Sequence, residues 1–337
     1  MSQKRSNEFR RNSLLEDALY EMSALLGPGE AIAEEPLSEP EQPVLFVIGA
    51  PRSGTTLSMQ TLASSGVFGY PSNLLSRFYA APYIGTLVQK IATDPDYDFK
   101  NEMSGGLLLQ KEFVSEIGKT IGALQPSEFW YFWRRFIPND QPRHISPEEE
   151  SKIDITGFRK GVAALEKGLS KPIVMKGLIL QYNLPLLLRI FPKALFLFVR
   201  REPVSNIKSL LIAREKHTGD RNVWFSVMPP GWEALPGQTP KRQVAGQILL
   251  TNHHIEQALK ILPPLNQFTY EYEDLCTDPA AWLNQVAEKI QQFGTGLLGE
   301  ISAPPPFRIT NSVDNDFNGK HHIQESITWV YSKFLCP

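Results

Sequence analysis

The chain alternates between short runs of mainly apolar residues and longer segments in which apolar residues recur at helical spacing. The runs that we expect to form strands are 44–48, 67–70, 173–176, 195–199 and 268–272. Most of them are apolar on both faces, as the strands of a parallel sheet are. Because helical segments such as 184–191 and 241–262 separate these runs, the pattern predicts an α/β fold. We expect a parallel β-sheet of about four to five strands flanked by helices, with right-handed crossovers.

Capping residues place further helices. Ser146 and Pro147 form a typical helix start, and they predict one helix from Glu148 to Gly168. A helix capped by Ser72 or Asn73 is also expected. The segment 214–237 contains two tryptophans and a Pro-Pro pair, so it is expected to be a long loop that forms a lid or a binding wall.

The N-terminal part has a different composition. Within residues 1–26, leucines, alanine and methionine recur at helical spacing, which predicts an amphipathic helix that Gly27-Pro28-Gly29 ends. Residues 30–43 hold five glutamates and three prolines, so they are expected to form an extended acidic linker. We therefore expect an N-terminal helix and linker over 1–42 and a single α/β domain over 43–337. The helix packs either on this domain or on the second subunit of a homodimer.

Residues 43–57 combine a strand, a glycine-flanked turn and the beginning of a helix. Gly49 and Gly54 bracket the turn, where the backbone must take a positive φ or approach a ligand closely. Free backbone N–H groups and the positive end of the helix dipole then face the same point. This segment therefore predicts an anion-binding site.

The two glycines have the spacing of the nucleotide-binding loop G-x-x-x-x-G-K-[ST], but Thr55 stands where the lysine belongs. Arg52 instead supplies a cation inside the loop, and Ser53 and Thr56 supply hydroxyl groups. Without the lysine, the loop lacks the charge that contacts the β- and γ-phosphates. Hydrolysis of ATP or GTP is therefore not expected.

Residues 51–57, Pro-Arg-Ser-Gly-Thr-Thr-Leu, resemble the 5′-phosphosulfate loop of bacterial sulfotransferases that use 3′-phosphoadenosine-5′-phosphosulfate (PAPS). The resemblance implies that this loop binds the 5′-phosphate and the sulfuryl group, and that Arg52 is also catalytic. The residues implied as donor ligands are Arg52, Ser53, Gly54, Thr55 and Thr56. The resemblance also implies a three-layer α/β sandwich related to P-loop proteins.

A second motif follows the run 195–199. Arg201 is followed by Pro203 and a predicted helix, and Ser209 stands eight positions after the arginine. In sulfotransferases this spacing binds the 3′-phosphate of PAPS. Physically, the guanidinium offers a charged fork to phosphate oxygens, and the helix returns the serine hydroxyl to the same oxygens. Alternation along the strand directs Arg200 elsewhere.

Two further segments resemble donor-binding motifs of the family. Tyr272-Glu273-Asp274-Leu275 is similar to the family's Tyr-Glu-Asp-Leu motif, which implies that Tyr272 lies near the adenine. Asn318-Gly319-Lys320 resembles the C-terminal phosphate loop, which implies that Lys320 reaches the 3′-phosphate.

Lys176 ends the run 173–176, at the sheet edge where ligands bind in α/β folds. It matches a lysine of the family, and we favour a catalytic role on the sulfuryl oxygens or the bridging oxygen. A surface lysine is the alternative. The histidine that follows two residues later in cytosolic members is replaced by Leu178.

The general base is left open by the sequence. Several sulfotransferases have a catalytic glutamate where this chain has Ser72 and Asn73. Glu128 is one candidate, because it precedes six aromatic residues within the eight positions 129–136, a stretch similar to one in bacterial sulfotransferases. Apolar rings raise the pKa of a carboxyl group, which suits proton transfer. His217 is a second candidate.

Structural alternatives apply to the same residues. Glu128 pairs with Arg134 or Arg135 in one alternative. The aromatic stretch forms either a core helix or one wall of an acceptor pocket.

Composition narrows the class of protein. The 337 residues are 42% hydrophobic and 21% charged, as in ordinary soluble proteins, and a net charge of −2 gives no reason to expect nucleic-acid binding. No apolar stretch of about 18 residues and no secretory signal are visible, so no membrane span is expected. Two cysteines favour a reducing compartment. We expect a cytoplasmic enzyme, unlike the anchored sulfotransferases of the animal Golgi.

The resemblance implies in-line transfer of a sulfuryl group from PAPS to a hydroxyl or amine of a small acceptor, such as a secondary metabolite. The product is 3′,5′-ADP, and no metal is expected. One alternative is a P-loop nucleotide kinase or ATPase, which requires magnesium. The other is a nucleotide-binding scaffold without turnover.

Overall fold

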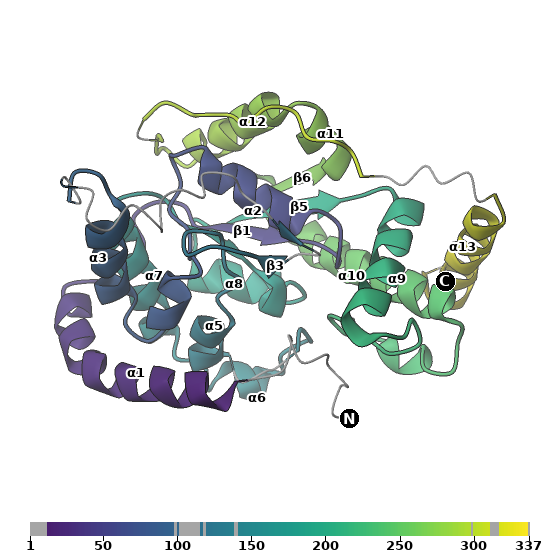
Figure 1. The fold of residues 1–337 in the computed structure, drawn as a ribbon, viewed down its shortest axis with the longest axis horizontal. Coiled ribbons are helices and arrows are strands. Elements are labelled where there is room, and N and C mark those ends of the chain that lie inside the picture. The colour runs from purple at the N-terminus through teal and green to yellow at the C-terminus, as the bar shows by residue number, and fades with distance from the viewer. Residues whose placement is uncertain are drawn as a thin grey trace.

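Four parallel strands form the central sheet, in the order β4-β1-β5-β6 (Figure 1). The structure is a computed structural model, and it describes residues 12–97, 100, 115–116, 119–137, 141–297, 299–310 and 317–335. The strands are β1 (Leu45–Ile48), β4 (Val174–Lys176), β5 (Leu195–Arg200) and β6 (Gln267–Glu271). A small antiparallel pair consists of β2 (Ser115–Glu116) and β3 (Lys119–Thr120). The predicted α/β fold with a parallel sheet is confirmed.

Helices connect and cover the strands. The α-helices are α1 (Ser13–Glu34), α2 (Thr55–Ser64), α3 (Pro82–Thr93), α5 (Trp130–Phe136), α6 (Pro147–Glu150), α7 (Ile155–Leu169), α8 (Leu184–Ile190), α9 (Pro203–Thr218), α10 (Pro240–Lys260), α11 (Tyr272–Thr277), α12 (Pro279–Gln291) and α13 (Phe317–Val330). The shorter turns are η2 (Leu75–Phe78), η3 (Leu178–Leu180), η4 (Trp232–Ala234), η5 (Pro264–Asn266) and the terminal η6 (Tyr331–Leu335).

Three layers follow from the alternation of side chains along each strand. All of β1 is fully buried. Phe46 and Ile48 pack into a cluster with α5, α7, α8 and α10, whereas Leu45 and Val47 pack into another with α2, α11 and α12. Figure 1 shows α2, α11 and α12 on one face of the sheet and α5, α7 and α8 on the other. The carboxyl ends of the strands are therefore the edge that remains open to a ligand.

The N-terminal helix is longer than expected. α1 continues through Gly27-Pro28-Gly29 to Glu34, so the predicted end of the helix and the start of the linker are wrong. The reason is a tertiary contact between α1 and α3. The buried carboxylate of Glu30 accepts hydrogen bonds from the backbone N–H groups of Tyr83 (2.7 Å) and Ile84 (3.0 Å) in the first turn of α3. These bonds hold the last turns of α1 in helical form, although glycine and proline have a weak helix propensity.

The acidic segment after α1 is also held in place, by hydrogen bonds to α7. The backbone N–H groups of Glu41 and Gln42 donate to the Glu166 carboxylate, each at 2.7 Å. α1 packs on α3 and α7 of the same chain, as one of the two predicted packings requires.

Several other boundaries differ from the predictions. The expected helix from Glu148 to Gly168 is two helices, α6 and α7, because the Asp154 side chain caps α7 through Gly157 N–H at 2.8 Å. The Ser146 capping box is confirmed.

The expected strand 67–70 is reduced to one bridge between Gly69 and Ile173, and the helix after Ser72 is the short turn η2. The loop expected from Arg214 begins later, because α9 runs to Thr218.

Candidate active site

The turn between β1 and α2 lies beyond the carboxyl end of β1, where ligands bind in α/β sheets. Gly54 has a φ of 115° and Arg52 has a φ of 65°. No side chain caps α2, so the N–H groups of its first turn are available to an anion. The Ser53 hydroxyl is buried and has no hydrogen-bond partner among the described residues. A buried hydroxyl without a partner beside uncapped N–H groups fits a bound phosphate or sulfate group.

Tyr272 packs directly against this turn. A Cβ atom at position 54 would lie 2.6 Å from Tyr272 Cδ2, so only glycine allows the contact. The Arg201 guanidinium lies over the Tyr272 ring, 4.5 Å from its centroid, and the Tyr272 hydroxyl is 3.1 Å from Thr310 Oγ1. Tyr272 therefore lies between the turn and Arg201.

The two arginine motifs meet. Arg52 Nε donates to Ser209 Oγ at 3.3 Å, and Arg201 Nη1 donates to the Arg52 carbonyl at 2.9 Å. Burial and the neighbouring Arg201 lower the pKa of Arg52. No carboxylate pairs with Arg52 within the part of the chain that the structure describes. Two adjacent guanidinium groups repel each other, and an anion bound between them relieves that repulsion.

Lys176 connects the turn to Glu128. The lysine is buried at the end of β4, and its Nζ donates to Thr56 Oγ1 (2.9 Å) and to Glu128 Oε1 (3.0 Å). Thus the interpretation of Lys176 as a surface lysine is wrong. Glu128 Oε2 accepts a hydrogen bond of 2.6 Å from Trp130 Nε1. The Thr56 hydroxyl, a cation and a carboxylate therefore lie in contact.

The environment of Glu128 differs from the expected one. Burial raises the pKa of its carboxyl group, but the Lys176 ammonium and the hydrogen bonds from Trp130 and Lys176 outweigh burial and lower the pKa overall. The prediction of a raised pKa is wrong, because hydrogen-bond donors and a positive charge contact the Glu128 carboxyl group in addition to aromatic rings. The carboxylate pairs with Lys176 rather than with Arg134 or Arg135.

The aromatic stretch divides between the core and the site. Phe129, Phe132, Trp133 and Phe136 are buried in the core around Phe158. Trp130, in the first turn, donates a hydrogen bond to Glu128, so most of the stretch is a core helix and its first turn borders the site.

Of the other predicted residues, His217 is not brought to this cluster. His217 is buried in the last turn of α9, where its ring stacks on Phe225 at 4.3 Å. It stands eight residues beyond Ser209 on the same helix, which is roughly 12 Å along the axis. Lys320 belongs to α13 rather than to a loop, and its side chain lies outside the described residues.

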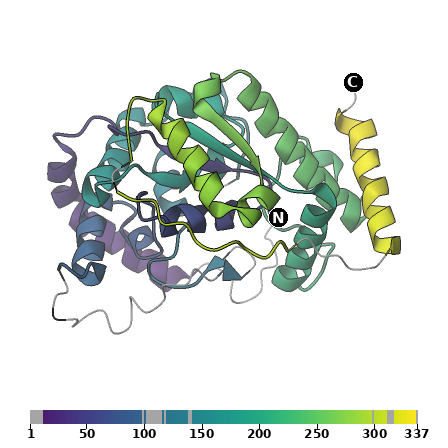
Figure 2. The ribbon, with the colours of Figure 1, turned by 90° about the horizontal axis from the view of Figure 1, so that it is seen from above.

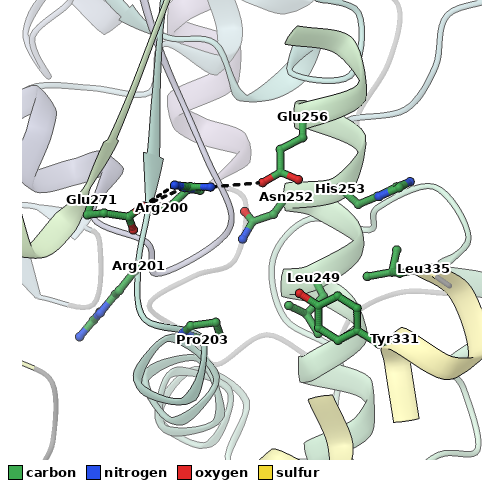
Figure 3. Close-up of a pocket in the computed structure, with 10 residues that line it drawn as sticks. All are labelled: Arg200, Arg201, Pro203, Leu249, Asn252, His253, Glu256, Glu271, Tyr331 and Leu335. Carbon is green, nitrogen blue, oxygen red and sulfur yellow. Dashed lines mark hydrogen bonds and ion pairs between the residues drawn. The ribbon is translucent and has the colours of Figure 1, made fainter. Parts of the chain in front are cut away.

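Arg200 faces a different region from Arg201 (Figure 3). It pairs with Glu271 at 2.6 Å and lies 3.8 Å from Glu256, on the side of α10. Together with Arg201, these residues line a pocket of about 320 Å³ between the ends of β5 and β6, α10 and η6. The predicted alternation of the two arginines is confirmed, and only Arg201 joins Arg52.

The sequence did not single out two of the residues at the site. Thr310 accepts from Arg201 Nη2 through its carbonyl, at 3.1 Å, and belongs to segment 299–310, which carries no motif. Figure 2 shows this segment returning across the face covered by α11 and α12. Trp130 was visible only as one of six aromatic residues, although its position two residues after Glu128 was a signal.

A cluster of potential metal ligands lies elsewhere. Among the described residues, His321, His322 and Glu325 come close enough together to share an ion, and all three are exposed on α13. Every helix in the described ranges is too short or too polar to span a lipid bilayer.

Comparisons with solved structures bear on the fold. The solved structures similar to the chain include sulfotransferase STF9 from Mycobacterium avium, with a TM-score of 0.52 and 12% identity over 99% of this chain and 88% of that one. Sulfotransferase STF1 from Mycobacterium tuberculosis H37Rv matches with a TM-score of 0.45 and 14% identity, over 92% and 81% of the two chains. A sulfotransferase domain from the curacin biosynthetic pathway matches with a TM-score of 0.39 and 17% identity, over 83% of each chain.

No curated protein matches the chain significantly. The model of the sulfotransferase family matches residues 43–292, which contain the turn after β1, Lys176, Arg201 and Tyr272. The chain therefore belongs to the sulfotransferase family.

Proposed function

We propose that this chain transfers a sulfuryl group from PAPS to a hydroxyl or amine of a small acceptor, such as a secondary metabolite. The contact between Arg52 and Ser209 carries the proposal, because it joins the motifs expected to bind the 5′-phosphosulfate and the 3′-phosphate of one donor molecule. Family membership supports the reaction class. The donor, the acceptor class and a cytoplasmic location are part of the proposal.

The donor ligands follow from the geometry. The uncapped N–H groups of α2 and the hydroxyls of Ser53, Thr55 and Thr56 would hold the 5′-phosphosulfate. Arg201 and Ser209 would hold the 3′-phosphate. Tyr272 would lie beside the adenosine, and Lys320 remains a predicted ligand of the 3′-phosphate.

The chemistry requires charge stabilisation and one proton transfer. PAPS supplies the sulfuryl group, which leaves the 5′-phosphate oxygen as the acceptor oxygen or nitrogen forms its bond to sulfur. Lys176 and Arg52 would stabilise the negative charge on the surrounding oxygens. Glu128, already ionised beside Lys176, would accept the acceptor's proton. No step uses a metal ion.

Two measurements test the proposal. Titration calorimetry should show binding of 3′,5′-ADP without magnesium, and weaker binding of ATP whether or not magnesium is present. Incubation with [³⁵S]PAPS and a panel of phenols, alcohols and amines should yield a labelled acceptor together with 3′,5′-ADP.

Other outcomes correspond to the alternatives. Magnesium-dependent ATP binding in place of 3′,5′-ADP binding would indicate a nucleotide kinase or ATPase. Tight binding of 3′,5′-ADP without transfer to any acceptor would indicate a scaffold.

A further inference from the structure

The Glu128 carboxylate is held by two donors that approach its two oxygens separately. Lys176 Nζ contacts Oε1 at 3.0 Å, and Trp130 Nε1 contacts Oε2 at 2.6 Å. The side chain of Lys176 is 5% exposed, whereas that of Glu128 is 38% exposed. The carboxylate is therefore anchored from the protein side and still open to an acceptor on the other side.

The two hydrogen-bond donors differ in how many partners they have during sulfuryl transfer. An ammonium has three N–H bonds, and Lys176 directs one to Glu128 and one to Thr56 Oγ1. In the proposed reaction Lys176 also stabilises negative charge on the sulfuryl oxygens. Its positive charge is therefore shared between Glu128 and the transferred group. Trp130 has one N–H, and it points only to Glu128. An uncharged hydrogen-bond donor with a single partner is suited to hold the Glu128 carboxylate while Lys176 interacts with PAPS.

The backbone between the two residues is shaped for this contact. Phe129 has φ 57° and ψ 34°, a left-handed conformation that is unfavourable for a non-glycine residue. Its buried ring stacks on Phe132 at 4.7 Å, and its N–H donates to Ser127 Oγ at 3.2 Å. These contacts hold the turn that brings the Glu128 and Trp130 side chains together. Unusual backbone conformations of this kind cluster at functional sites.

We propose that Trp130 is the positioning residue of Glu128, and that it holds the carboxylate ionised and oriented toward the acceptor through the indole N–H. The inference rests on the proposed function, in which Glu128 is the base. Trp130 itself touches neither the donor nor the reacting atoms.

The test compares Trp130→Phe with Trp329→Phe. Both tryptophans are partly buried and both stack on an arginine, Trp130 on Arg134 at 5.8 Å and Trp329 on Arg242 at 5.0 Å. Trp130→Phe should lower kcat by on the order of 10- to 100-fold and leave 3′,5′-ADP affinity unchanged. Losing a hydrogen bond to the carboxylate raises the pKa of Glu128, so the acid limb of kcat/KM should move up by about one pH unit. Trp329→Phe should change neither.

A double-mutant comparison separates positioning from a general structural role. In a Glu128→Gln background, Trp130→Phe should cause little further loss of kcat, because the base is already gone. An equal loss in both backgrounds, or an unmoved acid limb, overturns the inference.

A measurement without turnover keeps the inference separate from the proposed function. In a ¹H–¹⁵N spectrum at pH 7, the indole N–H signal of Trp130 should lie downfield and move upfield in Glu128→Gln, whereas that of Trp329 should not move. An unmoved Trp130 signal overturns the contact. If the signal moves but no acceptor is sulfated, the proposed function fails and the Trp130–Glu128 contact stands.

Discussion

Arg52 Nε donates a hydrogen bond to Ser209 Oγ at 3.3 Å, although 157 positions separate the two residues in the chain. The contact brings the turn after β1 beside the first half of α9. A ligand that carries two phosphates on one ribose, as 3′,5′-ADP does, can therefore reach both segments. The account of this chain as a PAPS-dependent enzyme depends on this relationship.

Replacing Arg201 should weaken the binding of 3′,5′-ADP selectively. Arg201→Ala removes a guanidinium beside Arg52, and a charged hydrogen bond lost from a phosphate site costs about 1.5–3 kcal/mol, or roughly 10- to 100-fold in Kd. Arg200→Ala is the matched control, since that neighbouring side chain faces Glu271 and Glu256. Calorimetry with 3′,5′-ADP and with 5′-AMP measures both effects. Equal losses for the two nucleotides would place the 3′-phosphate elsewhere.

Gly54→Ala should both destabilise the fold and abolish donor binding. The new Cβ would meet Tyr272 Cδ2 at 2.6 Å in a backbone with φ 115°, so the expected loss is roughly 2–4 kcal/mol. Gly66→Ala separates strain from the clash, because Gly66 also has a positive φ, of 80°, but open space around it. Its expected loss is about 1 kcal/mol. Urea unfolding measures both, and equal losses would show that the Tyr272 contact is unimportant.

The stability contributed by Glu128 should depend on pH. Its folded pKa lies below the ordinary value of 4.5, so its contribution is full above that value and is lost as the pH falls through the folded pKa. Glu128→Gln should cost about 1–2 kcal/mol at neutral pH, since a partly exposed pair is screened by solvent. The cost should shrink below pH 4.5.

Urea unfolding over a pH series measures this difference. Glu148→Gln, at an exposed pair with Lys152, is the control and should have little effect at any pH. A pH-independent cost of Glu128→Gln would mean that its ionised form is not what stabilises the fold.

Glu30→Gln should loosen α1. The neutral amide has one acceptor oxygen in place of two, so one of the backbone N–H groups of Tyr83 and Ile84 loses its partner at a cost of about 1–3 kcal/mol. Hydrogen exchange of residues 13–34 should accelerate relative to the sheet. Glu35→Gln, an exposed change just after the helix, should leave exchange as it is. Unchanged protection in Glu30→Gln would show that apolar packing alone holds α1.

The central sheet was predictable because most of its strands are apolar on both faces, a pattern that surface segments rarely show. The turn between β1 and α2 was predictable because glycines and hydroxyls at fixed spacing indicate local backbone geometry. Both kinds of signal are local in sequence.

The parts that failed depend on contacts between distant residues. Nothing near Gly27-Pro28-Gly29 indicates that Glu30 will reach the first turn of α3, 53 positions away. The pairing of Glu128 with Lys176 spans 48 positions, and it reversed the expected direction of the pKa shift. His217 looked like a loop histidine only because the end of α9 was placed too early.

The most direct test of the account is a crystal structure of the chain with 3′,5′-ADP. The account predicts the 5′-phosphate on the N–H groups at the start of α2, beside Ser53, and the 3′-phosphate within hydrogen-bond distance of Arg201 and Ser209. A nucleotide that lies in the pocket beside Arg200, or that contacts only one of the two motifs, would contradict it.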